Sequence, residues 1–296
     1  MKKFIFFAAC AVIAAAVSSC NPISNDPPAS QSAVTTAKDN LVLHIGFEPT
    51  IDKLPAGISE GEAFGEGSLQ GDGFYGFGYS NKSGDNTKQA YMSYKLAPGN
   101  PFTSLESMTI TCWVKLPAGK PAKGALLSFN GTGVEAVWPS FVYLFDNSGV
   151  NADTGQEEQD FNGRIDFLAV EGKPAMWPNV RSAEYARKDT WFQIARTYNA
   201  ADGKWANFVN CVIVNEGEFL PDGKVAGGIK AAFASDCDRL YIGGWASKIE
   251  GKAADEWLNY FPGAIDELRV FNKALSEAEV LSLYKEELKV SLEAKK

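Results

Sequence analysis

The strongest constraint on the fold is an alternation of apolar and polar residues that recurs along most of the chain. In SMTITCWVKL (residues 107–116), successive side chains point to opposite faces of an extended strand, so one face is apolar and the other is mixed. The same period of two recurs at residues 41–47, 90–96, 140–146, 163–170, 190–198, 206–214, 238–243 and 264–271. Many such strands between turn-rich segments predict an antiparallel β-sandwich.

The length of this region fits a single domain. Roughly 250 residues are enough for two average domains or for one large sandwich, and no linker divides them. No repeat of 20 to 50 residues is visible, which argues against a propeller or a solenoid. We therefore expect one domain over residues 39–290, followed by a polar tail at residues 291–296.

The N-terminus has the pattern of a targeting segment. MKKFIFFAACAVIAAAVSSC (residues 1–20) has two lysines, an apolar stretch too short to span a bilayer comfortably, and small residues before Cys20. VSSC resembles a bacterial lipobox, which implies a signal peptide at residues 1–19 and a lipid on Cys20. Several acyl chains on one cysteine would hold the protein at a membrane. A plain secretory signal, which needs no cysteine, is the alternative.

The next segment predicts a tether. Residues 20–38 consist mostly of proline, serine, threonine and other small or polar residues, without an apolar period. In an extended conformation such a segment would reach about 60 Å. We expect a lipid-anchored protein of the cell envelope, at the outer membrane of a diderm bacterium. No block of acids follows Cys20, so the sequence does not indicate whether the domain faces the periplasm or the surface.

The charge of the chain argues against nucleic acid as a partner. Loss of the leader removes Lys2 and Lys3 and lowers the basic residues from 28 to 26 against 36 acids, so the net charge falls from −8 to −10. Phosphate backbones would repel such a chain, and no basic cluster stands out against the total. We therefore expect membrane contact only through the lipid.

The cysteines outside the leader and the lipobox indicate buried thiols. Cys112, Cys211 and Cys237 are odd in number, so at least one is unpaired, and none of their spacings is that of a zinc site. Cys112 and Cys211 lie inside apolar runs, where a free cysteine acts as a small hydrophobe. A disulfide between these two is the alternative.

The C-terminal stretch FPGAIDELRVFNKALSEAEVLSLY (residues 261–284) combines a strand, a turn and a capped helix. Ser276 with Glu279 three residues later is a capping box. This stretch resembles the closing signature of LamG-like jelly rolls in the concanavalin A-like lectin/glucanase superfamily. MTITCWVK, DTWFQIARTYNAADGKWANFVN and LYIGGW agree in order. One departure is Cys211, which stands where the family commonly has a glycine in a tight turn.

The resemblance implies an all-β fold: a two-sheet antiparallel jelly-roll sandwich of the concanavalin A-like kind, with a short C-terminal helix. In this superfamily the loops often bind glycans. The fold alone does not imply an enzyme, because lectins, adhesion modules and glycosidases share it.

The sequence contains no recognisable catalytic acid pair. Glycosidases hold two carboxyl groups about 5 to 9.5 Å apart, facing one bond. Asp266 and Glu267 are adjacent in a strand, so we expect Asp266 on the inner face and Glu267 on the outer face. Glu158 and Asp160 resemble part of the laminarinase-like motif, but its third acid is missing and the stretch reads as a solvated loop. The only histidine, His44, is expected on a sheet face.

Calcium is the one cofactor that the resemblance implies. Many relatives of this fold bind a calcium ion, and the resemblance assigns Asp266 and Glu48 as its ligands. Calcium takes six to eight oxygens from carboxylates and backbone carbonyls. The alternative is that Asp266 accepts backbone hydrogen bonds where its strand begins.

Aromatic side chains in loop-like sequence are the candidates for sugar contact, because pyranose rings pack on flat aromatic faces. Beside proline, glycine or polar residues stand Trp138, Trp177, Trp245, Trp257 and Tyr260. For each tryptophan alone, packing under a loop is the alternative. We expect Trp113, Trp191 and Trp205 in the core or on a sheet face.

The sequence thus predicts a non-catalytic envelope protein that binds a glycan or glycoconjugate. Two other classes stay open. The first is an adhesion or assembly module with an envelope protein as partner. The second is a glycoside hydrolase or lyase, for which Glu158 and Asp160 are the candidate acids.

Overall fold

The structure is a computed structural model that describes residues 34–48, 54–118, 123–130, 141–166, 175–176, 179–219, 230–231, 237–252 and 259–295. Some predictions fall outside these ranges: the signal peptide, Cys20, most of the tether, Trp138, Trp177 and Trp257. Within the ranges, no helix has the length and apolar character needed to cross a membrane.

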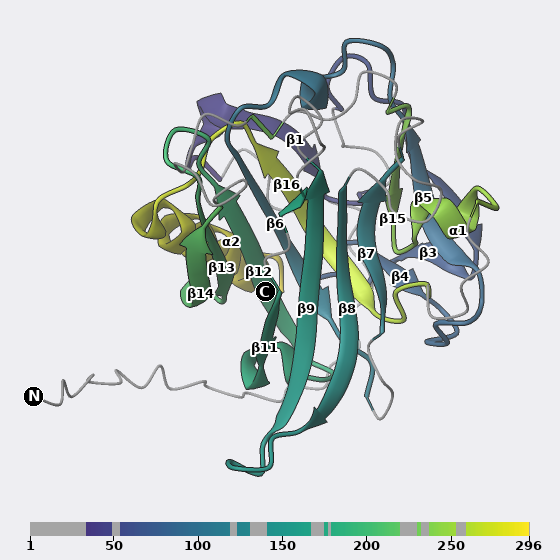
Figure 1. The fold of residues 1–296 in the computed structure, drawn as a ribbon. Coiled ribbons are helices and arrows are strands. Elements are labelled where there is room, and N and C mark those ends of the chain that lie inside the picture. The colour runs from purple at the N-terminus through teal and green to yellow at the C-terminus, as the bar shows by residue number, and fades with distance from the viewer. Residues whose placement is uncertain are drawn as a thin grey trace, which may run out of the picture.

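Two antiparallel sheets pack face to face (Figure 1). The first sheet has the order β14 (Val212–Glu218), β13 (Lys204–Val209), β12 (Trp191–Tyr198), β6 (Met108–Lys115), β16 (Ala264–Phe271), β4 (Gly78–Asn81) and β3 (Gly67–Gln70), with β1 (Leu41–Ile45) on β16. The second has the order β10 (Ala175–Met176), β9 (Glu157–Asp166), β8 (Phe141–Val150), β7 (Gly124–Phe129), β15 (Arg239–Ile242), β5 (Ala90–Lys95) and β2 (Glu62–Gly65), with β11 (Val180–Ser182) on β9. The predicted two-sheet sandwich is confirmed.

A short helical turn at Lys38–Asn40 precedes β1, and others connect strands at Pro101–Ser104, Ala183–Ala186 and α1 (Ala246–Ile249). The inner faces of the sheets form the main core. Alternate residues of β6, from Met108 to Val114, are buried in that core, as the alternation predicts. Trp113 points to the opposite face, into a separate cluster with Phe74 and Val290. The outer face of the first sheet is therefore also covered.

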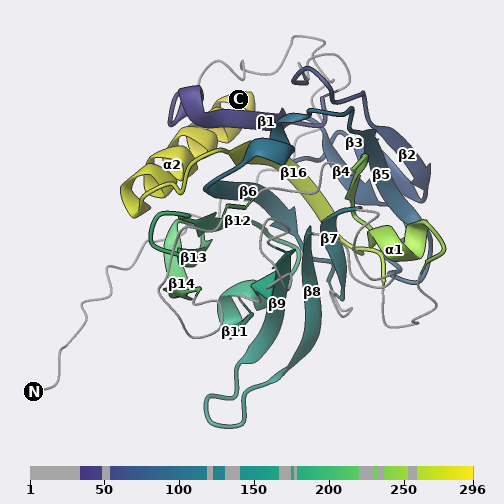
Figure 2. The ribbon, with the colours of Figure 1, turned by 45° about the horizontal axis from the view of Figure 1, so that its top comes forward.

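Helix α2 (Glu277–Ala294) provides this cover, on the side of the first sheet that faces away from the second (Figure 2). Its N-terminus has the predicted capping box, in which Ser276 accepts from the Glu279 backbone and Glu279 from the Ser276 backbone. Buried on its inner side are Val280, Leu283 and Val290. Stacked rings fix it further, since Trp113 lies between Phe74, at 3.5 Å, and Tyr284, at 5.5 Å between centroids.

The apolar run at residues 206–214 is a hairpin of β13 and β14, and the single strand predicted there is wrong. Asn210 and Cys211 form the turn with left-handed φ values of 47° and 64°. A two-residue hairpin turn with positive φ at both residues fits the twist of the flanking strands, and glycine is common in such turns. The family's tight turn is therefore present without its glycine. Cys112 and Cys211 are not joined by a disulfide.

Candidate functional site

Trp245 does not offer a ring to a ligand in this structure. Its exposed fraction is 1 %, and it packs on the outer face of the second sheet. It is covered there by Ala125, Val142 and Leu144. For Trp245 the structure therefore agrees with the alternative of packing within the protein and not with sugar contact by this ring. Large apolar side chains are mostly buried wherever a sheet face needs cover.

Tyr260 is also mostly buried, with 6 % exposure. Its ring stacks on Tyr91 with centroids 6.2 Å apart, and the Lys248 ammonium lies 5.3 Å from the ring centroid. One face of the Tyr260 ring is therefore covered within the protein. The three other aromatic candidates lie outside the described residues, so the predicted cluster of aromatic loops is not tested.

The adjacent acids Asp266 and Glu267 lie on the same side of the first sheet, contrary to the expectation from strand alternation. Asp266 pairs with Trp113, and Arg269 pairs with Thr111, so β16 holds one more residue than β6 between these pairs. Glu267 accommodates the extra residue with a left-handed φ of 51°. A β-bulge of this kind changes the direction of side chains. Asp266 therefore faces outward with Trp113, and its predicted place on the inner face is wrong.

Glu267 belongs to an ion network beneath α2. Its carboxylate lies 2.7 Å from His44 Nε2 and forms an ion pair with Arg269, which also pairs with Glu287 of the helix. Burial by itself would raise the pKa of Glu267, but Arg269 and His44 lower it to about 2. Burial raises the pKa of Glu287 to about 7, despite Arg269. The network attaches the helix to the sheet, and its carboxylates are closed to a substrate.

The other candidate acids, Glu158 and Asp160, lie in β9 and not in a loop. The prediction of a loop is wrong because β8 and β9 continue as one long hairpin. Each acid has its own partner: Asn151 donates to Glu158 at 3.0 Å, and Arg181 Nε lies 3.0 Å from Asp160. Burial raises the pKa of Asp160, although Arg181 opposes this. The first contact is a hydrogen bond from the loop of the hairpin, and the second is an ion pair between β11 and β9, so both acids have structural partners.

Glu48 and Asp266, the calcium ligands implied by the resemblance, do converge. Asp266 is fully buried and accepts hydrogen bonds from the backbone of Glu267, at 2.7 Å, and of Tyr75, at 3.3 Å. Glu48 is 8 % exposed and accepts from the backbone of Phe77 at 2.9 Å. Both acids thus bind one segment, residues 71–77, although they are far apart in the sequence. The predicted backbone hydrogen bonds to Asp266 are also present.

The chemistry of these donors fits a hard cation. Burial raises the pKa of Asp266 well above its usual range, and the nearby charges of Glu267 and Glu48 add to this. A cation between Glu48 and Asp266 would offset that repulsion. Gly76 keeps the space open, because a Cβ there would lie 1.9 Å from Glu48 Oε1. No group of three or more His, Cys, Asp or Glu within the described ranges could hold a metal, so backbone oxygens would have to complete the shell.

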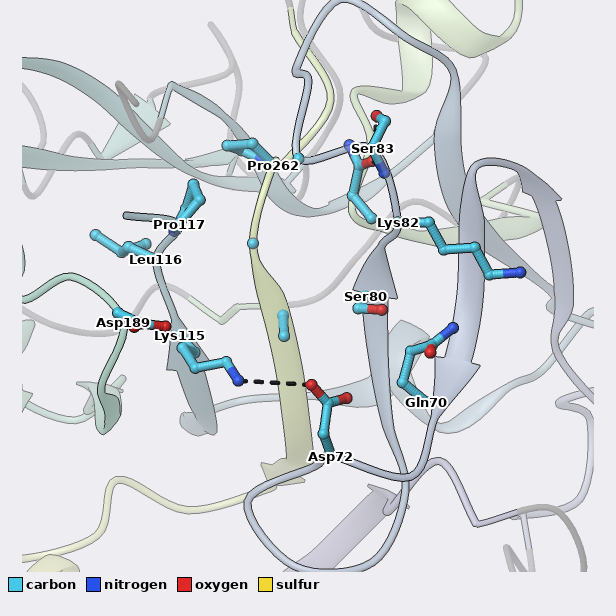
Figure 3. A pocket seen from close by; sticks show the side chains of 14 residues that line it. Gln70, Asp72, Ser80, Lys82, Ser83, Lys115, Leu116, Pro117, Asp189 and Pro262 are labelled. Carbon is cyan, nitrogen blue, oxygen red and sulfur yellow. Dashed lines mark hydrogen bonds and ion pairs between the residues drawn. The ribbon is translucent and has the colours of Figure 1, made fainter. Parts of the chain in front are cut away.

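The segment at residues 71–77 also contributes Asp72 to the lining of a groove on the first sheet (Figure 3). The groove has a volume of about 410 Å³. Its polar lining comes from strand ends and loops, and includes Gln70, Asp72, Ser80, Lys82, Lys115 and Asp189. Figure 3 shows Lys115 and Asp72 reaching toward each other across the end of β16, and their charged atoms are 3.7 Å apart.

The register of the strands explains the shape of the groove. Ser80, Ala264 and Lys115 lie in one row across β4, β16 and β6. The first two side chains are short, so the floor is low between the longer side chains around it. The row continues to Trp191 of β12, which is half-buried and carries Lys115 Nζ 5.3 Å from its ring centroid. A partly exposed aromatic ring thus adjoins a polar groove.

Sequence reasoning did not find this groove. The glycine-rich stretch 71–86 is typical of turns between aromatic residues, and no pattern in it marks Asp72 or Ser80 as part of a site. Trp191 was expected on a sheet face, which is confirmed. The signal in the sequence is that Lys115 and Trp191 stand at the ends of two segments with alternating apolar and polar residues. Only the order of the strands in the sheet places these two residues beside Ser80 and Ala264.

Comparisons with known proteins agree with the fold. A family model described as the concanavalin A-like lectin/glucanases superfamily matches residues 86–281, more than half of the chain. No curated protein sequence matches the chain.

Solved structures resemble the chain at low identity. The receptor-binding domain of botulinum neurotoxin mosaic serotype C/D has a TM-score of 0.53 and 12 % identity, over 84 % of this chain and 51 % of that one. The binding domain of botulinum neurotoxin serotype D has a TM-score of 0.52 and 12 % identity, over 85 % and 53 %. The chain therefore spans about half the length of these proteins, and at this identity the likeness concerns the fold alone.

Proposed function

The chain belongs to the concanavalin A-like lectin/glucanase superfamily, and on this basis we propose that it is a non-catalytic, glycan- or glycoconjugate-binding lipoprotein of the cell envelope. The observation that carries the proposal is the groove beside Trp191. Hydroxyl, amide, carboxylate and ammonium groups line it, and these are the groups that hydrogen-bond sugar hydroxyls. The ring of Trp191 provides the flat apolar surface.

The proposal includes a structural calcium ion near the groove. Glu48 and Asp266 would hold the ion together with backbone oxygens, and the ion would supply positive charge between two buried carboxylates. Residues 71–77 contact both acids and also provide Asp72 to the groove. The ion would therefore fix the segment that carries Asp72 to the sugar site.

A groove-filling substitution tests the proposed function. Ser80→Phe is expected to abolish binding on a glycan array, because the larger ring occupies the low floor of the groove. Trp191→Ala is expected to weaken binding about three- to tenfold, the range for losing one aromatic contact. The measurement is array binding followed by titration of the best ligand.

Trp205→Ala is the matched control, because Trp205 is also half-buried but pairs with Tyr198 at the other end of β12. Equal losses in Trp191→Ala and Trp205→Ala would count against the groove. If the wild-type protein bound no glycan at all, a protein-binding adhesion or assembly module would become the better hypothesis.

The lipid anchor needs its own test, because it rests on the sequence of residues 1–20. Cys20→Ser is expected to move the protein from the membrane fraction to the soluble fraction, since the thiol that carries the acyl chains is gone. Fractionation of cells and labelling with a radioactive fatty acid measure the change. A Cys10→Ser variant is the control, because that cysteine lies within the predicted leader. Retention of Cys20→Ser in the membrane would contradict the anchor.

A further inference from the structure

Two lysines lie over two aromatic rings that contact each other, and one of these lysines, Lys115, lines the groove. Lys115 Nζ lies 5.3 Å from the centroid of Trp191, and Lys295 Nζ lies 5.7 Å from the centroid of Phe74. The two rings contact each other edge to face, with centroids 6.4 Å apart. The lysines come from β6 and from the residue after α2, and the contact between the two rings brings these two parts of the chain together.

The positive charges of Lys115 and Lys295 are only partly compensated by acidic side chains. Burial lowers the pKa of Lys295, and the nearby charge of Lys115 lowers it further. Lys115 forms an ion pair with Asp72, whose carboxylate is 3.7 Å away and 69 % exposed. Asp189 and Lys82 line the same groove. An ammonium has three N–H donors, so a lysine that covers a ring keeps donors for a ligand.

We propose that the groove binds an acidic saccharide, whose carboxylate or sulfate lies between Lys115 and Lys295 while its sugar ring packs beside Trp191. The inference rests on the proposed glycan-binding function and names the ligand class. The protein as a whole has a net charge of −8, so long-range attraction would not bring an anion here. The specificity must come from these local contacts.

Titration with a charged and an uncharged form of one oligosaccharide tests the proposal. The probes are tetragalacturonate and its fully methyl-esterified form, titrated into the full-length protein by calorimetry. We expect tetragalacturonate to bind at least tenfold more tightly, and to lose affinity as salt is added. A second pair, cellotetraose with and without sulfate groups, shows whether sulfate can replace the carboxylate.

Substitutions of the two lysines test whether they bind the anionic group of the ligand. Lys115→Gln and Lys295→Gln are each expected to lower the affinity for tetragalacturonate about three- to tenfold, and the lysine-to-arginine variants should keep most of it. Lys204→Gln is the control, because this exposed lysine lies at the opposite end of the β12–β13 hairpin. Its affinity should match the wild type.

The outcomes separate the inference from the proposed function. Equal affinity for the acid and its ester would overturn the acidic ligand and leave glycan binding in place. Binding that both glutamine variants retain, or that Lys204→Gln reduces equally, would also overturn the site. Binding of neither these probes nor any glycan on the array would overturn both proposals.

Discussion

Arg269→Met is expected to lower the free energy of unfolding by about 3–5 kcal/mol, the cost of breaking a buried ion pair on one side. Arg269 is 1 % exposed and pairs with Glu267 and Glu287, both fully buried. Without the guanidinium, Glu267 keeps its contact with His44 Nε2 at 2.7 Å. The two carboxylates would then have to take up protons or draw in water. Urea denaturation at neutral pH measures the change.

Arg181→Met is the matched control for this prediction. Arg181 also forms an ion pair between strands, with Asp160 at 3.0 Å, but its side chain is 48 % exposed. Exposed pairs contribute about 0–1 kcal/mol, so its loss should have little effect. Similar small losses in both variants would mean that the network does not hold α2 to the sheet.

The fold could be predicted from the sequence because its signals are local. The alternation in β6 directly reports which residues face the core, and the capping box at Ser276 and Glu279 marks the start of α2. Each signal spans only a few residues. Apolar residues also recur at helical spacing in α2, at Val280, Leu283, Tyr284 and Leu288, and this stripe predicts that the helix packs on the sheet. The burial of Val280 and Leu283 confirms the prediction.

The bulge at Glu267 could not be predicted in the same way. Nothing in the sequence Ile-Asp-Glu-Leu marks a left-handed residue, because glycine or asparagine usually occupies such positions. The ion network with Arg269 and His44 stabilises this conformation, and its members are on different strands and on α2. Alternation alone therefore placed Asp266 on the wrong face.

The groove could not be predicted from the sequence for a related reason. Its floor depends on two short side chains, Ser80 and Ala264, which are far apart in the sequence and become neighbours only through the pairing of β4 with β16. Trp245 illustrates the same limit, since its neighbours Gly and Ala are compatible with sugar contact or with packing, and only the outer face of the second sheet shows that the ring is packed. Composition around a residue predicts a loop but not what the loop covers.

Gly76→Ala is expected to abolish the stabilisation of the protein by calcium. Gly76 has a φ of +70°, and an added Cβ would lie 1.9 Å from Glu48 Oε1, so the Glu48 carboxylate must move away from Asp266. In the wild type, calcium at a hundred times its dissociation constant should add about 2.7 kcal/mol to the free energy of unfolding. The measurement is the thermal midpoint with calcium and with a chelator, and Asp266→Asn should lose the same response.

Gly99→Ala separates this effect from backbone strain. Gly99 has a φ of +75°, so alanine is strained there as it is at residue 76, but no atom lies within 4 Å of its added Cβ. Both alanine variants should lose about 1 kcal/mol of stability in the presence of a chelator. Gly99→Ala should keep the full rise in midpoint with calcium, because Glu48 and Asp266 remain in place. If calcium raised the midpoint of Gly76→Ala and Asp266→Asn as much as that of the wild type, calcium would bind elsewhere. The segment at residues 71–77, which carries Asp72 to the groove, would then be held in place by Phe74. Phe74 stacks on Trp113, and its backbone carbonyl accepts a hydrogen bond from Ser291 at 2.9 Å.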